Sequence, residues 1–118
     1  MTRPAPPLPA LPADLTARAA FEAAILPALL RPPCLVSFSG GRDSSAVLAT
    51  ATAVARREGL PLPVPATHRF PSAAGTLESD WQEQVIRHLD LDDWIRLDVT
   101  SELGCLGPVA KATLHRHG

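Results

Sequence analysis

Residues 34–59 read CLVSFSGGRDSSAVLATATAVARREG and are the most informative part of the sequence about the fold. It opens with a short apolar run, residues 34–38, of the kind found in strands that are buried on both faces of a parallel sheet. After a turn with two glycines, apolar residues recur at helical spacing over 43–58, and Gly59 marks the end of a helix. The stretch is therefore predicted to be a strand, a glycine-rich loop and a helix.

Helices and strands alternate on both sides of this stretch as well. Before it, the apolar spacing predicts a helix that Asp14 caps and that Pro27 kinks or ends. After it, the pattern predicts a strand near 66–70, a helix over 75–89 and a half-exposed strand over 94–99. Strands alternating with helices of this size indicate an α/β fold, in which helices cover both faces of a parallel sheet.

Composition restricts the class of protein. The 118 residues are 46% hydrophobic and 19% charged, enough for one domain with a core, in which Trp81, Trp94 and Cys34 are expected to be buried. A formal net charge of −1 gives no electrostatic case for nucleic-acid binding. No apolar run is long enough to cross a membrane, and two cysteines are too few for a disulfide framework. A cytoplasmic protein is therefore expected.

The chain is expected to divide into two parts. Residues 1–13 are rich in proline and almost uncharged, which is typical of an extended leader. Residues 14–118 are expected to form the α/β domain, although 101–118 begin a helix that Gly104, Gly107 and Pro108 interrupt. Three strands make a small sheet, so part of the domain is expected to be missing.

The most informative residues are SGGRDS, residues 39–44, between the first strand and its helix. At such a turn, free backbone N–H groups and the positive end of the helix dipole point to one place. Two glycines allow an anion to approach closely, and Ser39 and Ser44 add hydroxyl donors. A carboxylate at Asp43 would repel a bare phosphate, but it suits a Mg²⁺ ion that bridges it to phosphates.

Two better-known phosphate loops are excluded. A Walker A loop needs a lysine after its second glycine, and the only lysine in the chain, Lys111, is in the wrong context. The dinucleotide fingerprint GxGxxG does not occur. His115 and His117 lack partner ligands at metal-binding spacing, and SGGRDS read without its context is only a glycine-rich turn with a good helix cap.

In its context, SGGRDS resembles the SGGxDS pyrophosphate loop of the ATP-pyrophosphatase (PP-loop) superfamily. Three further segments, SFSGGRDSSAVLA, ATHRF and ESDWQEQVIRHLDLDDWIRLDV, look most like the synthetase domain of asparagine synthetase. The resemblance covers about residues 34–100 and implies an adenine nucleotide alpha-hydrolase-like, Rossmann-like fold. It also implies an amide-forming ligase that adenylates a substrate carboxylate with ATP and Mg²⁺ and releases pyrophosphate.

The resemblance assigns roles to individual residues. The residues expected to hold the pyrophosphate part of ATP are Ser39, Gly40, Gly41, Asp43 and Ser44, and Asp43 would also share the Mg²⁺ ion. Arg42 stands at the variable position of the motif and receives no role. The backbone of the second strand would lie beside adenine, at Thr67, His68, Arg69 and Phe70.

The sequence departs from the family in three respects. Thr2 follows Met1 where glutamine-dependent asparagine synthetases have a nucleophilic cysteine, and nothing after Val99 resembles their second acidic motif or substrate-binding helices. The chain is therefore expected to hold only the nucleotide half of a site, with an unidentified carboxylate substrate and amine donor. Two alternatives stay open: a non-catalytic nucleotide-binding module that needs a partner chain, and a PP-loop enzyme of another branch.

Overall fold

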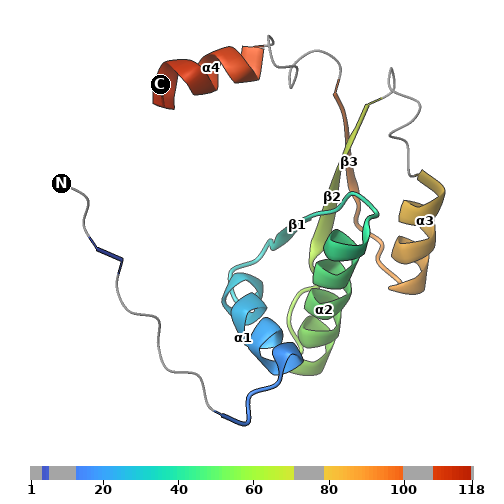
Figure 1. Cartoon of the computed structure of the whole chain (residues 1–118). Helices are drawn as coiled ribbons and strands as arrows, with labels where there is room; N and C mark the ends of the chain where they lie inside the picture. The colour runs from blue at the N-terminus through green and yellow to red at the C-terminus, as the bar shows by residue number, and fades with distance from the viewer. Residues whose placement is uncertain (1–3, 6–12, 71–78, 100–107, 118) are drawn as a thin grey trace.

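The computed structural model describes residues 4–5, 13–70, 79–99 and 108–117. Within these ranges the chain forms a three-stranded parallel sheet in the order β1-β2-β3, with four helices (Figure 1). The elements in chain order are α1 (Ala17–Leu29), β1 (Leu35–Ser37), α2 (Arg42–Glu58), β2 (Val64–Arg69), α3 (Ser79–His88), β3 (Ile95–Asp98) and α4 (Pro108–His117). The α/β class and the parallel sheet are confirmed.

Several predictions fall outside the described residues. These are most of the leader over 1–13, the start of the helix expected over 75–89, and Gly104 and Gly107 of the last segment. The other boundaries agree with the sequence pattern to within a few residues, except that Pro108, expected to interrupt a helix, is the first residue of α4. Proline is tolerated at the first position of a helix, where its missing N–H has no partner to lose. The helix over 43–58 begins one residue earlier, and Gly59 adopts the left-handed conformation (φ 66°) that ends it.

One face of the sheet carries the hydrophobic core. Side chains alternate between the two faces of a strand, and the strand register places Val36, Phe38 and Thr67 on the same face. All three are at least 93% buried, under α2 and α3, which contribute Leu48, Val54 and Ile86 to the core. Because α2 and α3 are consecutive right-handed crossovers between neighbouring strands, they lie on the same face.

The opposite face of the sheet is open in the described part of the chain. Leu35, Ile95 and Leu97 project from it with 58%, 39% and 50% of their surface exposed. α1 packs on α2, and α4 stands apart from the sheet in Figure 1. The prediction of helices on both faces is therefore met on one face only within the described residues.

The first helix differs from its prediction at both ends. Thr16, rather than Asp14, is the N-cap, because its side chain accepts a hydrogen bond from the N–H of Ala19 at 3.1 Å. Pro27 does not end the helix, which continues to Leu29. Leu29 is 1% exposed, so its burial in the core favours two more residues of helix beyond the proline.

The two tryptophans have different environments. Trp94 packs against the core and meets Phe38 edge to face, with ring centroids 6.5 Å apart. Trp81 lies on the outer side of α3 and is 65% exposed, so the prediction that it anchors the core is wrong. The buried side of α3 is formed by other residues: Gln82 and Ile86 face the sheet.

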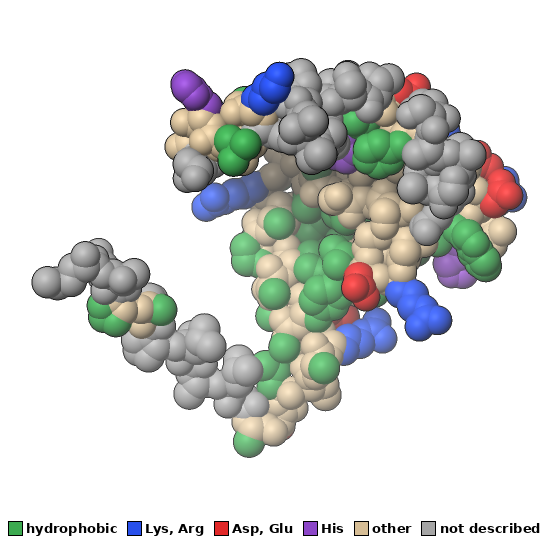
Figure 2. All heavy atoms as spheres, turned by 45° about the horizontal axis from the view of Figure 1, so that its top comes forward, with side chains coloured by type: hydrophobic (Ala, Val, Ile, Leu, Met, Phe, Trp, Pro, Cys, Tyr) green, Lys and Arg blue, Asp and Glu red, His purple; other side chains and the backbone are tan. Residues whose placement is uncertain are grey.

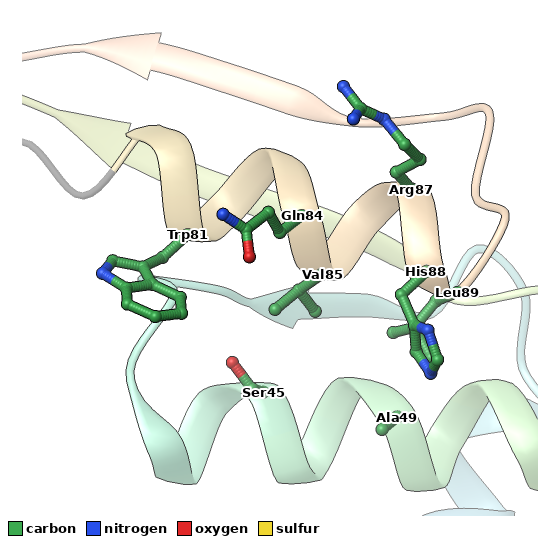
Figure 3. A pocket seen from close by; sticks show the side chains of 8 residues that line it. All are labelled: Ser45, Ala49, Trp81, Gln84, Val85, Arg87, His88 and Leu89. Atoms are coloured by element: carbon green, nitrogen blue, oxygen red, sulfur yellow. The ribbon is translucent and has the colours of Figure 1, made fainter.

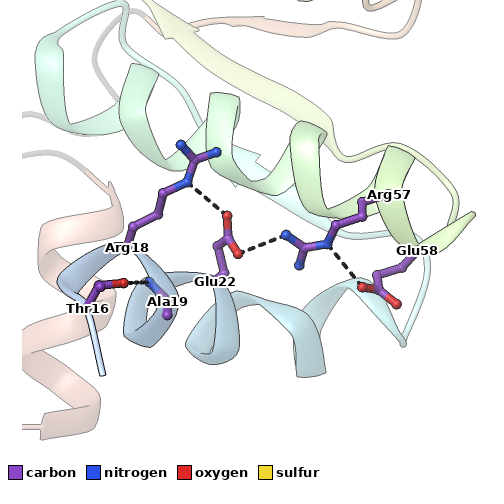
Figure 4. A network of polar contacts seen from close by, with 6 residues as sticks. All are labelled: Thr16, Arg18, Ala19, Glu22, Arg57 and Glu58. Carbon is purple, nitrogen blue, oxygen red and sulfur yellow. Dashed lines mark hydrogen bonds and ion pairs between the residues drawn. The ribbon is translucent and has the colours of Figure 1, made fainter. Parts of the chain in front are cut away.

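An ion-pair chain joins α1 to α2 (Figure 4). Glu22 accepts from Arg18 at 3.1 Å and from Arg57 at 2.9 Å, and Arg57 also donates to Glu58 at 3.2 Å. The hydrogen bonds from Arg57 and then Arg18 lower the pKa of Glu22 below its usual value of 4.5, and those from Glu22 and Glu58 raise the pKa of Arg57. The Glu22 carboxylate therefore stabilises the folded state above pH 4.5, and this contribution is lost as the pH falls through the lowered pKa.

The variant Glu22→Gln is expected to be less stable than wild type at neutral pH, and the difference is expected to shrink as the pH falls below 4.5. Urea unfolding at a series of pH values measures it. Glu83→Gln is the control, because Glu83 is an exposed carboxyl with no ion pair among the described residues. A difference for Glu22→Gln that persisted unchanged into acid would contradict this account of the ion pair.

The surface shows no concentration of one charge on the face drawn in Figure 2, where basic and acidic side chains are scattered among apolar ones. None of the helices in the described ranges has the length and apolar character that crossing a bilayer requires.

Candidate functional site

The glycine-rich loop lies where the sequence places it, at the carboxyl end of β1 and the amino end of α2. Gly40 has φ 90°, a conformation that residues with a Cβ atom rarely adopt, so the turn requires glycine there. Gly41 is the N-cap of α2, and no side chain caps the helix from this position. The first N–H groups of α2 therefore have no acceptor within the helix, and they point to the space beyond the strand end.

The loop is closed by hydrogen bonds among its own residues. The N–H of Ser39 donates to Ser44 Oγ at 3.2 Å, and the N–H of Gly41 donates to Ser39 Oγ at 3.3 Å. Ser44 Oγ lies 3.1 Å from Ser39 Oγ and donates to the Gly41 carbonyl at 3.4 Å. The two serine hydroxyls thus hold the shape of the loop, which leaves the N–H groups of Arg42, Asp43 and Ser44 as the donors for an anion.

Asp43 stands in the first turn of α2 and is exposed. Its carboxylate makes no hydrogen bond or ion pair within the described residues, so it is available to a cation. No three His, Cys, Asp or Glu residues in these ranges gather to hold a metal ion by themselves. One carboxylate fits Mg²⁺ where phosphate oxygens and water complete the coordination, as Mg²⁺ prefers.

The residues of β2 that were expected near adenine face in different directions. Thr67 is 1% exposed, and its hydroxyl donates to the Phe38 carbonyl at 2.7 Å and accepts from Trp94 Nε1 at 2.9 Å, so its one donor hydrogen is used within the protein. His68 is exposed on the open face of the sheet, opposite Leu97. Phe70 follows the strand and is half-buried. Arg69 alone of these side chains lies on the helix-covered face without a polar partner.

Two buried polar groups lie near the loop without partners. Nε and Nη2 of Arg69 and Oε1 of Gln82 are buried, and none of these atoms has a hydrogen-bond partner in the part of the chain that the structure describes. Gln82 comes from α3, is 5% exposed and donates through Nε2 to the Ser39 carbonyl at 2.8 Å. No sequence pattern indicated Gln82, since a glutamine on a helix is usually exposed.

The guanidinium of Arg69 is positioned by an aromatic ring. Its Cζ lies 5.3 Å from the Trp94 ring centroid, and Arg96 lies 4.7 Å from the same centroid. Stacking on the electron-rich ring partly offsets the free-energy cost of burying the Arg69 charge. Trp94 therefore links the strand β3 to Thr67 and Arg69 at the carboxyl end of β2.

A groove of about 720 Å³ runs along the outer side of α2 and α3 (Figure 3). Trp81 lies over Ser45 at one end, His88 lies at the other end, and Val85 and Ala49 form the floor between them. The groove includes Ser45 but none of residues 39–44, so it is separate from the candidate phosphate site.

In comparisons with known proteins, no family model, no curated protein and no solved structure matches this chain. The candidate site therefore depends on the motif and on its geometry.

Proposed function

We propose that this chain binds Mg·ATP through residues 39–44. The observation that carries the proposal is the combination at one point of a glycine at φ 90°, the uncapped amino end of α2 and the unpaired carboxylate of Asp43. Ligands of open α/β sheets bind beyond the carboxyl ends of the strands, which is where this loop lies. The Rossmann-like, adenine nucleotide alpha-hydrolase-like form of the fold belongs to the same proposal.

The chemistry follows from what the chain's own groups can do. The N–H groups at the start of α2 would bind phosphate oxygens, and the helix dipole would favour their charge. Asp43 would hold a Mg²⁺ ion, which supplies positive charge that neutralises the leaving pyrophosphate. By positioning the nucleotide, the loop would prepare the α-phosphate for attack by a substrate carboxylate, the reaction of an ATP-dependent amide-forming ligase of the asparagine synthetase type.

The test is calorimetric titration of ATP into wild type and Asp43→Ala, with and without Mg²⁺. With Mg²⁺, the variant is expected to bind ATP at least about tenfold more weakly, equivalent to about 1.4 kcal/mol, because a metal contact is lost. Without Mg²⁺, the variant is expected to bind ATP no more weakly than wild type, because the repulsion between Asp43 and the phosphates is gone.

Asp80→Ala is the matched control, since Asp80 is also an exposed carboxylate in the first turn of a helix, here α3. It is expected to leave Mg·ATP binding unchanged. Equal heats for wild type and Asp43→Ala in the presence of Mg²⁺ would refute the nucleotide role of the loop.

The open apolar face of the sheet favours a second candidate, a nucleotide-binding module that works with a partner chain. Leu35 and Leu97, half exposed or more, are the kind of surface that a parallel sheet normally covers. Both candidates share ATP binding and a cytoplasmic location. Pyrophosphate release by the isolated chain, offered ATP with carboxylates and ammonia, would favour the ligase, and binding without release would favour the module.

A further inference from the structure

The unpartnered groups of Arg69 and Gln82 are unusual in a folded chain. More than nine in ten buried polar groups have a hydrogen-bond partner, because an unpaired one costs free energy. Among the described residues, two donor nitrogens of Arg69 and one acceptor of Gln82, Oε1, are buried and unpaired. Arg69 therefore lacks a hydrogen-bond acceptor, and Gln82 lacks a hydrogen-bond donor, among the described residues.

Gln82 contacts the phosphate loop, and Arg69 lies at the end of the strand next to β1. Gln82 reaches the loop directly, since its Nε2 donates to the Ser39 carbonyl at 2.8 Å. Arg69 ends β2, the strand next to β1, and it lies on the helix-covered face together with Thr67. Neighbouring strands are about 4.8 Å apart, so the end of β2 is within the length of a nucleotide from the loop.

Arg69 makes no ion pair among the described residues, although a carboxylate stands at the paired position on the neighbouring strand. Asp98 is the direct partner of Arg69 across the β2–β3 pair, yet no ion pair joins them. The ring of Trp94, 5.3 Å from Cζ, fixes the guanidinium without using its N–H groups. Arg69 is therefore positioned by the ring, while Nε and Nη2 are buried without a hydrogen-bond partner among the described residues.

We infer that Arg69 and Gln82 recognise the nucleoside monophosphate part of the nucleotide whose pyrophosphate part lies in the loop. Arg69 donates to a phosphate oxyanion, and Gln82 Oε1 accepts from a hydroxyl or amino group of the nucleoside. A nucleotide offers both kinds of group in one molecule, whereas inorganic pyrophosphate offers only the first. This inference rests on the proposed function and adds to it the residues that distinguish ATP from pyrophosphate.

The experiment compares Mg·ATP and inorganic pyrophosphate with Mg²⁺ as probes, by calorimetry, on wild type and three variants. In Arg69→Gln, the ratio of ATP affinity to pyrophosphate affinity is expected to fall about tenfold, the loss typical of a charge-assisted hydrogen bond. Gln82→Met is expected to lower the same ratio. Arg96→Gln is the matched control, because Arg96 stacks on the same Trp94 ring but is exposed and has no buried unpaired atom.

Thermal unfolding separates ligand recognition from a structural role. Arg69→Gln is expected to melt no lower than wild type, because it replaces a charged group whose buried nitrogens have no partner among the described residues with a smaller neutral one. An unchanged affinity ratio in Arg69→Gln, while wild type binds ATP, would overturn the inference and leave the proposed function standing. Failure of wild type to bind Mg·ATP, or binding indifferent to Asp43→Ala, would instead count against the proposed function.

Discussion

Replacing Phe38 by alanine is expected to lower the free energy of unfolding by about 3–5 kcal/mol. Phe38 is 1% exposed and is among the largest fully buried side chains of the described residues. Its ring packs edge to face on Trp94, so truncation removes an aromatic contact and leaves a cavity under α2. Domains of this size have about 5–15 kcal/mol of stability in total, so the variant would lose a large fraction of it. Urea unfolding followed by tryptophan fluorescence measures the loss.

Phe21→Ala is the matched control for this prediction. It deletes the same atoms from α1, at a position that is 37% exposed, so the expected loss is below about 1 kcal/mol. Comparable losses in the two variants would mean that the core does not lie between β1 and the helices as described.

Replacing Thr67 by valine is expected to destabilise the protein by about 2 kcal/mol although the two side chains have nearly the same shape. The hydroxyl of Thr67 donates to the Phe38 carbonyl at 2.7 Å and accepts from Trp94 Nε1 at 2.9 Å. Valine makes neither hydrogen bond, so the indole N–H and the carbonyl lose their partner in a site from which water is excluded. Because Trp94 also carries Arg69, weaker ATP binding is expected as well.

Thr52→Val tests whether the cost comes from unpaired groups rather than from a lost hydroxyl. Thr52 is equally buried at 1% exposure, and its hydroxyl donates to the Leu48 carbonyl at 2.7 Å. That carbonyl keeps its ordinary helical hydrogen bond in the variant, so a change below about 1 kcal/mol is expected. Equal unfolding free energies for Thr67→Val and Thr52→Val would contradict the hydrogen-bond chain proposed for Thr67.

The local sequence predicted the elements of the fold well because each depends on neighbouring residues. The apolar run at 34–38 and the helical spacing over 43–58 gave β1 and α2, and Gly59 ended α2 in the left-handed conformation. The errors arose where a distant contact outweighed a local preference. Pro27 favours a helix end, but the burial of Leu29 extends the helix beyond it.

The candidate site divides in the same way. The position of the glycine-rich loop and the exposed carboxylate of Asp43 follow from the order of strand, loop and helix. The sequence did not show that the hydroxyls of Ser39 and Ser44 bond to each other and to the loop backbone rather than pointing outward. Nor did it show Gln82, because only the packing of α3 brings that side chain to the loop.

Local sequence patterns were enough to predict the α/β class, the parallel strands and the loop at the end of β1, since periodicity and glycine placement act over a few residues. The covered face of the sheet, the exposure of Trp81 and the packing of Trp94 depend on how the elements pack. So do the buried atoms of Arg69 and Gln82 that have no partner among the described residues. These properties depend on contacts between residues far apart in the chain. Local patterns carry no information about such contacts until the elements pack.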